Sequence, residues 1–154
     1  MLFHTRPLPI SFAALLMALL PQATAHAETL IEGPVLADVV RVVDGDTLLV
    51  MARPWPQQTI EVFVRLRGID TPELRAHCAK GREAAQEAKR LLEDLAARSP
   101  QVRLTQIAAD KYFGRIVADV SLEDGRDPAR EMMAAGLAAR YSGKGRKNDL
   151  CEDH

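Results

Sequence analysis

The chain has 154 residues and a formal net charge of −1, so it is long enough for one domain with a modest core. A near-neutral chain has no overall field that attracts a polyanion, which excludes nucleic-acid binding through net charge alone. Any contact with nucleic acid would depend on local positive groups or on a bound cation.

Residues 1–27 have the pattern of a secretory signal peptide. The N-terminal residues, which include the basic Arg6, precede the apolar run Ile10–Leu20. The residues Ala25-His26-Ala27 that follow have the small-x-small pattern of a cleavage site. The run is too short to cross a bilayer, which takes about 20 apolar residues, although an uncleaved anchor is the alternative. We therefore expect cleavage after Ala27, a mature domain of residues 28–154 with a charge near −2, and a secreted or periplasmic protein without stable membrane association.

The mature chain has two cysteines, Cys78 and Cys151. In an oxidising compartment an even count favours a disulfide, which would contribute about 4 kcal/mol to stability in the chain-entropy model. The alternative is a zinc ion bound by His77, Cys78, Cys151 and His154, whose side chains are suitable ligand types. Adjacent His77 and Cys78 are an awkward ligand pair, and secreted thiols tend to oxidise, so the disulfide is favoured.

Three strands are expected first in the mature chain. Apolar residues over positions 37–51 surround Asp44-Gly45, a dipeptide typical of tight hairpin turns that need positive φ angles. The stretch Arg53–Pro56 interrupts this pattern. Thr59–Arg67 resumes it, with apolar side chains on one face of the strand and arginines on the other.

Two helices and two further strands are expected after residue 67. In chain order they are an amphipathic helix over Arg82–Arg98, strands over Val102–Ala108 and Arg115–Ser121, and a short helix from Asp127-Pro128 to Gly136. Leu137–Tyr141 could return to a sheet, and residues 143–147 form a basic, glycine-rich tail.

This order of elements predicts a mainly β protein with helices, α+β by content. Three strands, a long helix, two strands and a short helix fit the OB-fold. In that fold a five-stranded Greek-key barrel has the long helix between strands 3 and 4 and the short helix after strand 5. Sandwiches and small α+β folds have similar orders of strands and helices, so the order alone does not establish the fold.

Charged residues concentrate between Arg65 and Glu73, where the third strand runs into a loop. Two guanidiniums, two carboxylates and Thr71-Pro72 lie within these nine residues. Such a cluster fits phosphate chemistry, but Thr71-Pro72-Glu73 also fits a helix start, with an N-cap, an N1 proline and a first-turn acid. Taken singly, Asp44–Thr47 fits a plain hairpin turn and Arg115 a solvated strand start.

Taken together, these motifs resemble the staphylococcal nuclease (thermonuclease) family. The resemblance extends from Val39 to Tyr141 and comprises Asp-Gly-Asp-Thr at 44–47, Arg65, Asp-Thr-Pro-Glu at 70–73, Asp110-Lys111-Tyr112, Gly114-Arg115 and residues 131–138. It implies an OB-fold and a monomeric, calcium-dependent nuclease. The expected reaction is hydrolysis of phosphodiester bonds in DNA, RNA or both, leaving 3′-phosphate ends.

By position, the resemblance implies a metal site in the charged cluster. Asp46 and Asp70 would be carboxylate ligands of calcium, and Thr71 would contribute its backbone carbonyl. Calcium takes six to eight oxygen ligands and tolerates a shell completed by water and substrate, so these three donors are a plausible partial set.

The resemblance also implies a role for each remaining site residue. Arg65 and Arg115 would hold the scissile phosphate, and Glu73 would face the attacking water, either as its base or as a positioning group. The residues expected to contact the nucleotide are Lys111, Tyr112 and Tyr141. The chain departs from the family at Phe113, an extra residue between Tyr112 and Gly114 that leaves the aim of Arg115 open.

The competing hypothesis is an OB-type module that binds single-stranded nucleic acid or a protein without catalysis. Such a module has no reason to keep Arg65, Glu73 and Arg115 together with Asp46 and Asp70. Aromatic residues are also only 5% of the chain, which offers few surfaces for base stacking. The nuclease is therefore the favoured prediction.

Overall fold

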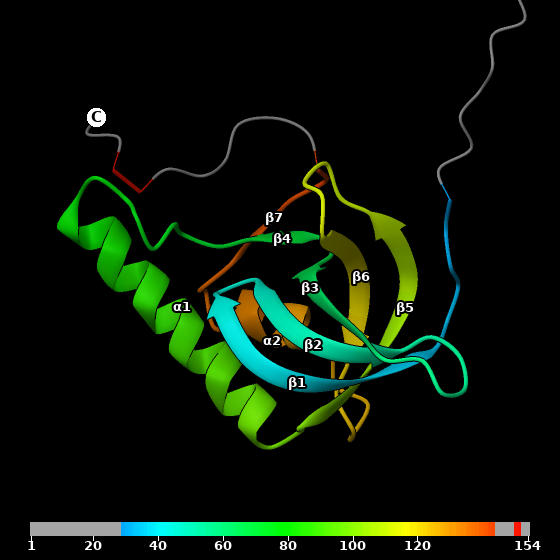
Figure 1. Cartoon of the computed structure of the whole chain (residues 1–154). Helices are drawn as coiled ribbons and strands as arrows, with labels where there is room; N and C mark the ends of the chain where they lie inside the picture. The colour runs from blue at the N-terminus through cyan, green and yellow to red at the C-terminus, as the bar shows by residue number, and fades with distance from the viewer. Residues whose placement is uncertain (1–28, 144–149, 152–154) are drawn as a thin grey trace, which may run out of the picture.

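Five strands close into a barrel in the computed structural model, which describes residues 29–143 and 150–151 (Figure 1). The strands are β1 (Val35–Asp44), β2 (Thr47–Arg53), β3 (Ile60–Leu66), β5 (Gln101–Ala109) and β6 (Arg115–Ser121). Their order around the barrel is β1-β2-β3-β6-β5, and β5 pairs back with β1. β3 and β6 run parallel, whereas the other neighbours are antiparallel. This order confirms the predicted five-stranded OB-type barrel.

Irregular pairing bends two of the strands. β1 shifts its register against β2 at two places. β5 shifts against β6 between Thr105 and Ala108, and Gln106 within this shift has a φ of 50°. Bulges of this kind bend a strand and increase its twist, which lets a small number of strands close on themselves.

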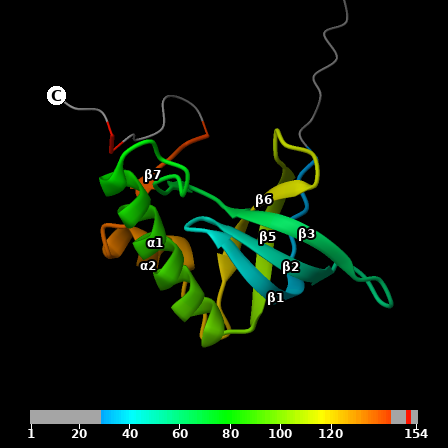
Figure 2. The same cartoon turned by 60° about the vertical axis from the view of Figure 1, so that its left-hand side comes forward.

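Both helices lie on one side of the barrel (Figure 2). They are α1 (Ala79–Ala97) and α2 (Pro128–Ala134), and α2 follows the predicted N-cap Asp127. Leu92 and Leu95 of α1 and Met132 of α2 are buried in the same core as the inward side chains of the strands. Amphipathic packing therefore attaches both helices to the barrel.

The start of α1 differs from the prediction of Arg82. The helix begins at Ala79, and Cys78 is its N-cap, with Sγ accepting a hydrogen bond from the backbone N–H of Gly81 at 3.2 Å. Residues 71–73 are not helical, so the alternative that they start a helix is wrong. Cysteine is not among the favoured N-caps, so the usual sequence signal for a helix start is missing here.

A two-stranded sheet outside the barrel was not predicted. β4 (Ile69–Asp70) pairs antiparallel with β7 (Ala139–Arg140), so the stretch expected to return to a sheet joins this small one. The backbone N–H of Tyr141 donates to the carbonyl of Gly68 at 2.9 Å. The pairing places the residues after β7 beside the loop that follows β3.

Cys78 and Cys151 form a disulfide bond. Their sulfur atoms are therefore not available as zinc ligands, and the zinc alternative fails for this pair; His154 lies outside the described residues. A Cβ added at Gly81 would lie 2.8 Å from Sγ of Cys151, so the glycine leaves room for the bond. The disulfide ties residues 150–151 to the first turn of α1.

Residues 1–28 and 144–149 lie outside the described part of the chain, and with them the predicted signal peptide and most of the basic tail. Of the helices in residues 29–143 and 150–151, none is both long and apolar enough to span a membrane.

We predict that Cys151→Ser lowers the free energy of unfolding by about 2–4 kcal/mol. The reason is that the unfolded chain regains freedom once the covalent link, with a sequence separation of 73, is lost. Urea unfolding followed by circular dichroism measures the change. The double variant Cys78→Ser/Cys151→Ser is the control, because a serine at position 78 keeps an N-cap oxygen. Unfolding midpoints that stay the same in both variants and under dithiothreitol would contradict a stabilising role.

Candidate active site

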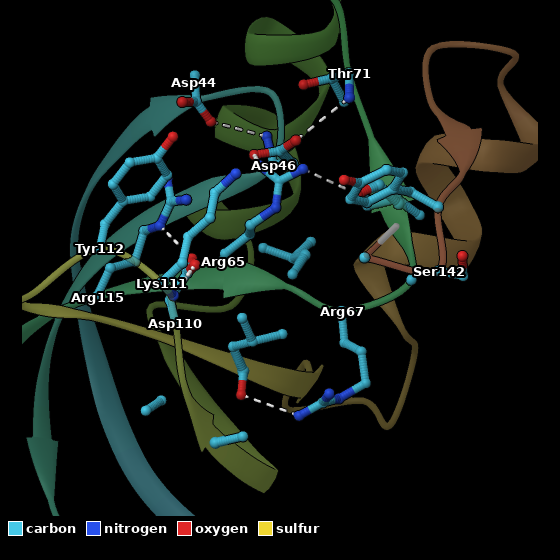
Figure 3. Close-up of a pocket in the computed structure, with 18 of the residues that line it drawn as sticks. Asp44, Asp46, Arg65, Arg67, Thr71, Asp110, Lys111, Tyr112, Arg115 and Ser142 are labelled. Atoms are coloured by element: carbon cyan, nitrogen blue, oxygen red, sulfur yellow. Dashed lines mark hydrogen bonds and ion pairs between the residues drawn. The ribbon is translucent and has the colours of Figure 1, made fainter. Parts of the chain in front are cut away.

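A pocket of about 970 Å³ opens where the β1–β2 turn, the end of β3, the β5–β6 turn and the residues after β7 meet (Figure 3). Its charged lining is balanced, with four carboxylates and four cations. The acids are Asp44, Asp46, Glu73 and Asp110, and the bases are Arg65, Arg67, Lys111 and Arg115. The pocket therefore offers positive groups for an anion without a strong positive field of its own.

Arg65 joins two carboxylates that come from different elements. Its Nη1 lies 2.7 Å from Oδ1 of Asp46 in the β1–β2 turn, and its Nη2 lies 2.8 Å from Oδ1 of Asp70 on β4. The exposed fractions of the three side chains are 13% for Arg65, 4% for Asp46 and 5% for Asp70. Nη2 also donates to the carbonyl of Ile69 at 3.3 Å. The guanidinium thus holds three backbone segments in one buried ionic cluster.

Hydrogen bonds fix the orientation of the Asp46 carboxylate. Oδ1 accepts from the hydroxyl of Thr47 at 3.0 Å, and Oδ2 accepts from the backbone N–H of Thr71 at 3.3 Å. Burial raises the pKa of Asp46 to about 6; Arg65 opposes this rise, and the Asp44 carboxylate adds to it. Because burial disfavours the charged carboxylate, a further cation beside Asp46 would stabilise it.

Gly45 brings the β1–β2 turn against α1 and the loop after β4. A Cβ at this position would lie 2.8 Å from Cβ of Ala88 and 2.8 Å from Oγ1 of Thr71. The predicted hairpin is confirmed, and Gly45 forms its turn without a positive φ. The turn needs glycine for close approach, which brings Asp46 within reach of the Thr71 N–H.

Arg115 is held at the start of β6 by Asp110 at the end of β5. Its Nε lies 2.5 Å from Oδ2 of Asp110, whose Oδ1 accepts from the backbone N–H of Lys111 at 2.6 Å. The guanidinium carbon of Arg115 lies 4.7 Å from the ring centroid of Tyr112, and Nζ of Lys111 lies 5.0 Å from it. Cation–π contacts therefore gather both cations on one ring. Figure 3 shows this group beside Asp46 and Arg65.

The other predicted site residues belong to the same region. Thr71 and Glu73 line the pocket from the loop after β4, and Tyr141 lines it from the end of β7. Thr71 is buried, Glu73 is exposed and Tyr141 is half-buried. Asp70 is not part of the lining but contacts Arg65 directly.

Three charged lining residues were not predicted as site residues. Asp44 accepts a hydrogen bond from the backbone N–H of Asp46 at 3.1 Å, and Asp110 holds Arg115. Arg67 donates from Nη2 to the carbonyls of Gln106 and, at 3.1 Å, of Val117, which holds it against the barrel wall. Asp44 and Asp110 each sit where a strand gives way to a turn, and this position is the signal that could have identified them.

The oxygen donors of Asp46, Asp70 and the Thr71 carbonyl are the chemical types that calcium prefers. Across residues 29–143 and 150–151, no three His, Cys, Asp or Glu side chains gather into a metal-binding group. As calcium ligands, these three donors would need water and substrate oxygens to reach the six to eight that the ion takes. The donor types fit calcium and lack the sulfur and nitrogen ligands typical of zinc.

Comparison with known families identifies one match. A family model described as a staphylococcal nuclease homologue matches residues 63–153, which is more than half of the chain. The matched stretch contains Arg65, Asp70, Glu73 and Arg115, whereas Asp46 precedes it and reaches the site through the fold. No match to a curated protein is found. Membership of this family indicates a nuclease with a nucleic-acid substrate. The chain belongs to the family of staphylococcal nuclease homologues.

Proposed function

We propose that the chain is a secreted or periplasmic, calcium-dependent nuclease that hydrolyses phosphodiester bonds in DNA, RNA or both and leaves 3′-phosphate ends. The observation that carries this proposal is the convergence of Arg65 and Arg115 on one pocket, together with Glu73 and the Asp46 carboxylate. The family match supports the reaction class.

The two arginines suit the charge that develops on a phosphodiester as water adds to it. Groups that are already in position stabilise this charge more than they stabilise the bound substrate. Asp46 and Asp70 hold Arg65 in place, and Asp110 holds Arg115. The hydrogen bonds that Arg65 makes to Asp46, Ile69 and Asp70 account for three of its five N–H groups, so the guanidinium retains donors for a phosphate.

We propose that Glu73 contacts the attacking water. Its side chain is exposed and belongs to the pocket lining on the loop after β4, next in sequence to the Thr71-Pro72 pair. A carboxylate at such a position can orient a water molecule and accept its proton. Both functions need the charged oxygen, so the isosteric amide is the informative substitution.

Calcium would be held by Asp46, Asp70 and the carbonyl of Thr71. When bound, it would add positive charge beside the phosphate. The balanced lining gives a physical reason for this ion, because four acids offset four bases in the pocket. A polyanionic substrate would gain little from that pocket without an added cation.

Secretion is supported by two observations on this chain. Residues 1–27 have the composition of a cleavable signal peptide. The disulfide between Cys78 and Cys151 is of the kind that persists in an oxidising compartment. Action as a monomer stays a prediction.

We predict that Arg115→Ala lowers kcat about a hundred- to a thousandfold, because it removes a positioned donor from the transition state. Glu73→Gln should likewise abolish most of the activity while leaving the fold intact. Cleavage of labelled single- and double-stranded DNA and RNA, in calcium and in chelator, measures both effects. Arg90→Ala and Glu87→Gln on the exposed face of α1 are matched controls that should cleave at the wild-type rate. Equal rates for all variants would contradict the proposal, and unchanged cleavage in chelator would contradict the metal alone.

We predict that calcium raises the Tm of the mature chain and that Asp46→Asn removes this shift. At a calcium concentration 100 times its Kd, binding contributes about 2.7 kcal/mol, or roughly 5–10 °C for a domain of this size. Differential scanning calorimetry measures the shift without any dependence on activity. Asp94→Asn, an exposed acid on α1, is the matched control and should keep the full shift. A calcium shift that survives in Asp46→Asn would place the ion elsewhere.

A further inference from the structure

Arg67 is a cation of the pocket lining to which the proposed reaction gives no role. It follows Arg65 by two positions at the end of β3, and its backbone N–H continues the pairing with β6 by donating to the carbonyl of Ala118 at 3.0 Å. Both arginines therefore project from the same face of the strand, with their backbones about 7 Å apart. Figure 3 shows Tyr112 and Arg67 on opposite sides of Arg65. Arg67 thus extends the positive side chains of the pocket away from the β5–β6 turn.

A bulge in β5 holds the guanidinium of Arg67 in place. Nη2 donates to the carbonyl of Gln106, which has a φ of 50° within the β5 register shift, and at 3.1 Å to the carbonyl of Val117. The segment before β1 supports this bulge, because the backbone N–H of Gln106 donates to the carbonyl of Glu32 at 3.1 Å. A residue with a Cβ adopts a positive φ only at an energetic cost, and here it supplies a carbonyl that accepts from the arginine. Arg67 is therefore positioned jointly by β3, β5 and β6.

These contacts leave donors of Arg67 for an anion. Nε is buried 3.3 Å from Oδ1 of Asp119 and forms no hydrogen bond, and Nη1 donates to no group in the part of the chain that the structure describes. The Arg67 side chain is 38% exposed and that of Asp119 is 50% exposed, so water weakens the attraction between them. A guanidinium that is held in place and retains N–H groups is suited to phosphate oxygens.

The spacing of Arg65 and Arg67 suits two consecutive phosphates of one strand. One nucleotide of an extended strand covers a span similar to that of two residues along β3. With one phosphate held by Arg65 and Arg115, the next phosphate along the strand can contact Arg67 within the same pocket. Contacts of this kind fix the position of a strand without reading its bases.

We propose that Arg67 binds the phosphate next to the one that Arg65 and Arg115 hold, on the side of the pocket away from the β5–β6 turn. The inference rests on the proposed function for the position of the cleaved phosphate. The neighbouring phosphate then helps to place the scissile bond, and a substrate with a single isolated phosphodiester lacks this contact.

The test removes the charge of the arginine and the charge of the neighbouring phosphate, singly and together. A tetranucleotide has one cleavable phosphodiester at its centre and a charged, cleavage-resistant phosphorothioate on either side; in two test substrates, one flanking linkage is a neutral methylphosphonate. The wild type should lose roughly tenfold in kcat/KM on one of the two test substrates, as expected for one hydrogen bond to a charged group. Arg67→Met should lose about the same factor on the charged substrate and nothing further when that linkage is neutral.

Two variants control for the loss of an arginine. Arg67→Lys keeps the charge and should retain most of the dependence on the flanking linkage. Arg103→Met removes an arginine on β5 that also donates to a backbone carbonyl, that of Leu122 at 3.4 Å, but does not line the pocket, so it should keep the wild-type dependence. Equal losses of Arg67→Met on the charged and neutral substrates would show that the arginine acts only through the fold, and would overturn the inference.

A binding readout keeps this inference separate from the proposed function. A labelled single-stranded oligonucleotide is titrated with the Glu73→Gln variant in calcium at several salt concentrations. Adding Arg67→Met should reduce the slope of log K against log salt by about 0.7, the value for one phosphate contact to a single strand, whereas adding Arg103→Met should not. If the wild type cleaves nothing but the slope depends on Arg67, the function fails and the phosphate contact stands. If the wild type cleaves and the slope is the same with and without Arg67→Met, this inference is overturned.

Discussion

The site depends on the ionic contact of the Arg65 guanidinium with two buried carboxylates, those of Asp46 and Asp70. It connects the β1–β2 turn, β3 and β4, and the backbone N–H of Leu66 reinforces the connection by donating to the carbonyl of Asp46 at 2.8 Å. Removing one member of such a buried pair typically costs about 3–5 kcal/mol, because the remaining charge is left without compensation. The same cluster therefore stabilises the fold and borders the pocket, so removing its central cation would also loosen the fold around the pocket.

The topology of the barrel decides what lies next to this cluster. Thr47 on β2 and Val117 on β6 are the register partners of Arg65, so its side chain projects from the middle of three strands. On β6, Arg115 lies two residues before Val117. Because β3 and β6 are parallel, Arg115 therefore pairs with Phe63, two residues before Arg65 on β3. A single strand register therefore places both Arg65 and Arg115 at the pocket. The acids of the pocket balance its bases, in keeping with a chain that has almost no net charge, and this balance is the physical reason for the bound cation that we propose.

Periodic patterns made much of the fold predictable. Apolar residues on both sides of Asp44-Gly45 identified β1 and β2, apolar patterns farther along the chain identified β3, β5 and β6, and Asp127-Pro128 identified the start of α2. The strands β4 and β7 have two residues each, which is too short for an alternating pattern of apolar residues. They form because β3 and α2 bring them together. The start of α1 depends on Cys78 as N-cap, which local preference does not favour. The motifs identified most of the site residues. Asp44 and Asp110 belong to the same motifs but were not predicted as site residues, because only the fold shows their contacts with Asp46 and Arg115.

A crystal structure of the mature chain with calcium and a phosphorothioate oligonucleotide that resists cleavage would test the central claim most directly. The account predicts one phosphate group in contact with both Arg65 and Arg115, with calcium beside Asp46 and Asp70 and an ordered water near Glu73. A phosphate bound outside this pocket, or one that reaches only one of the two arginines, would contradict it.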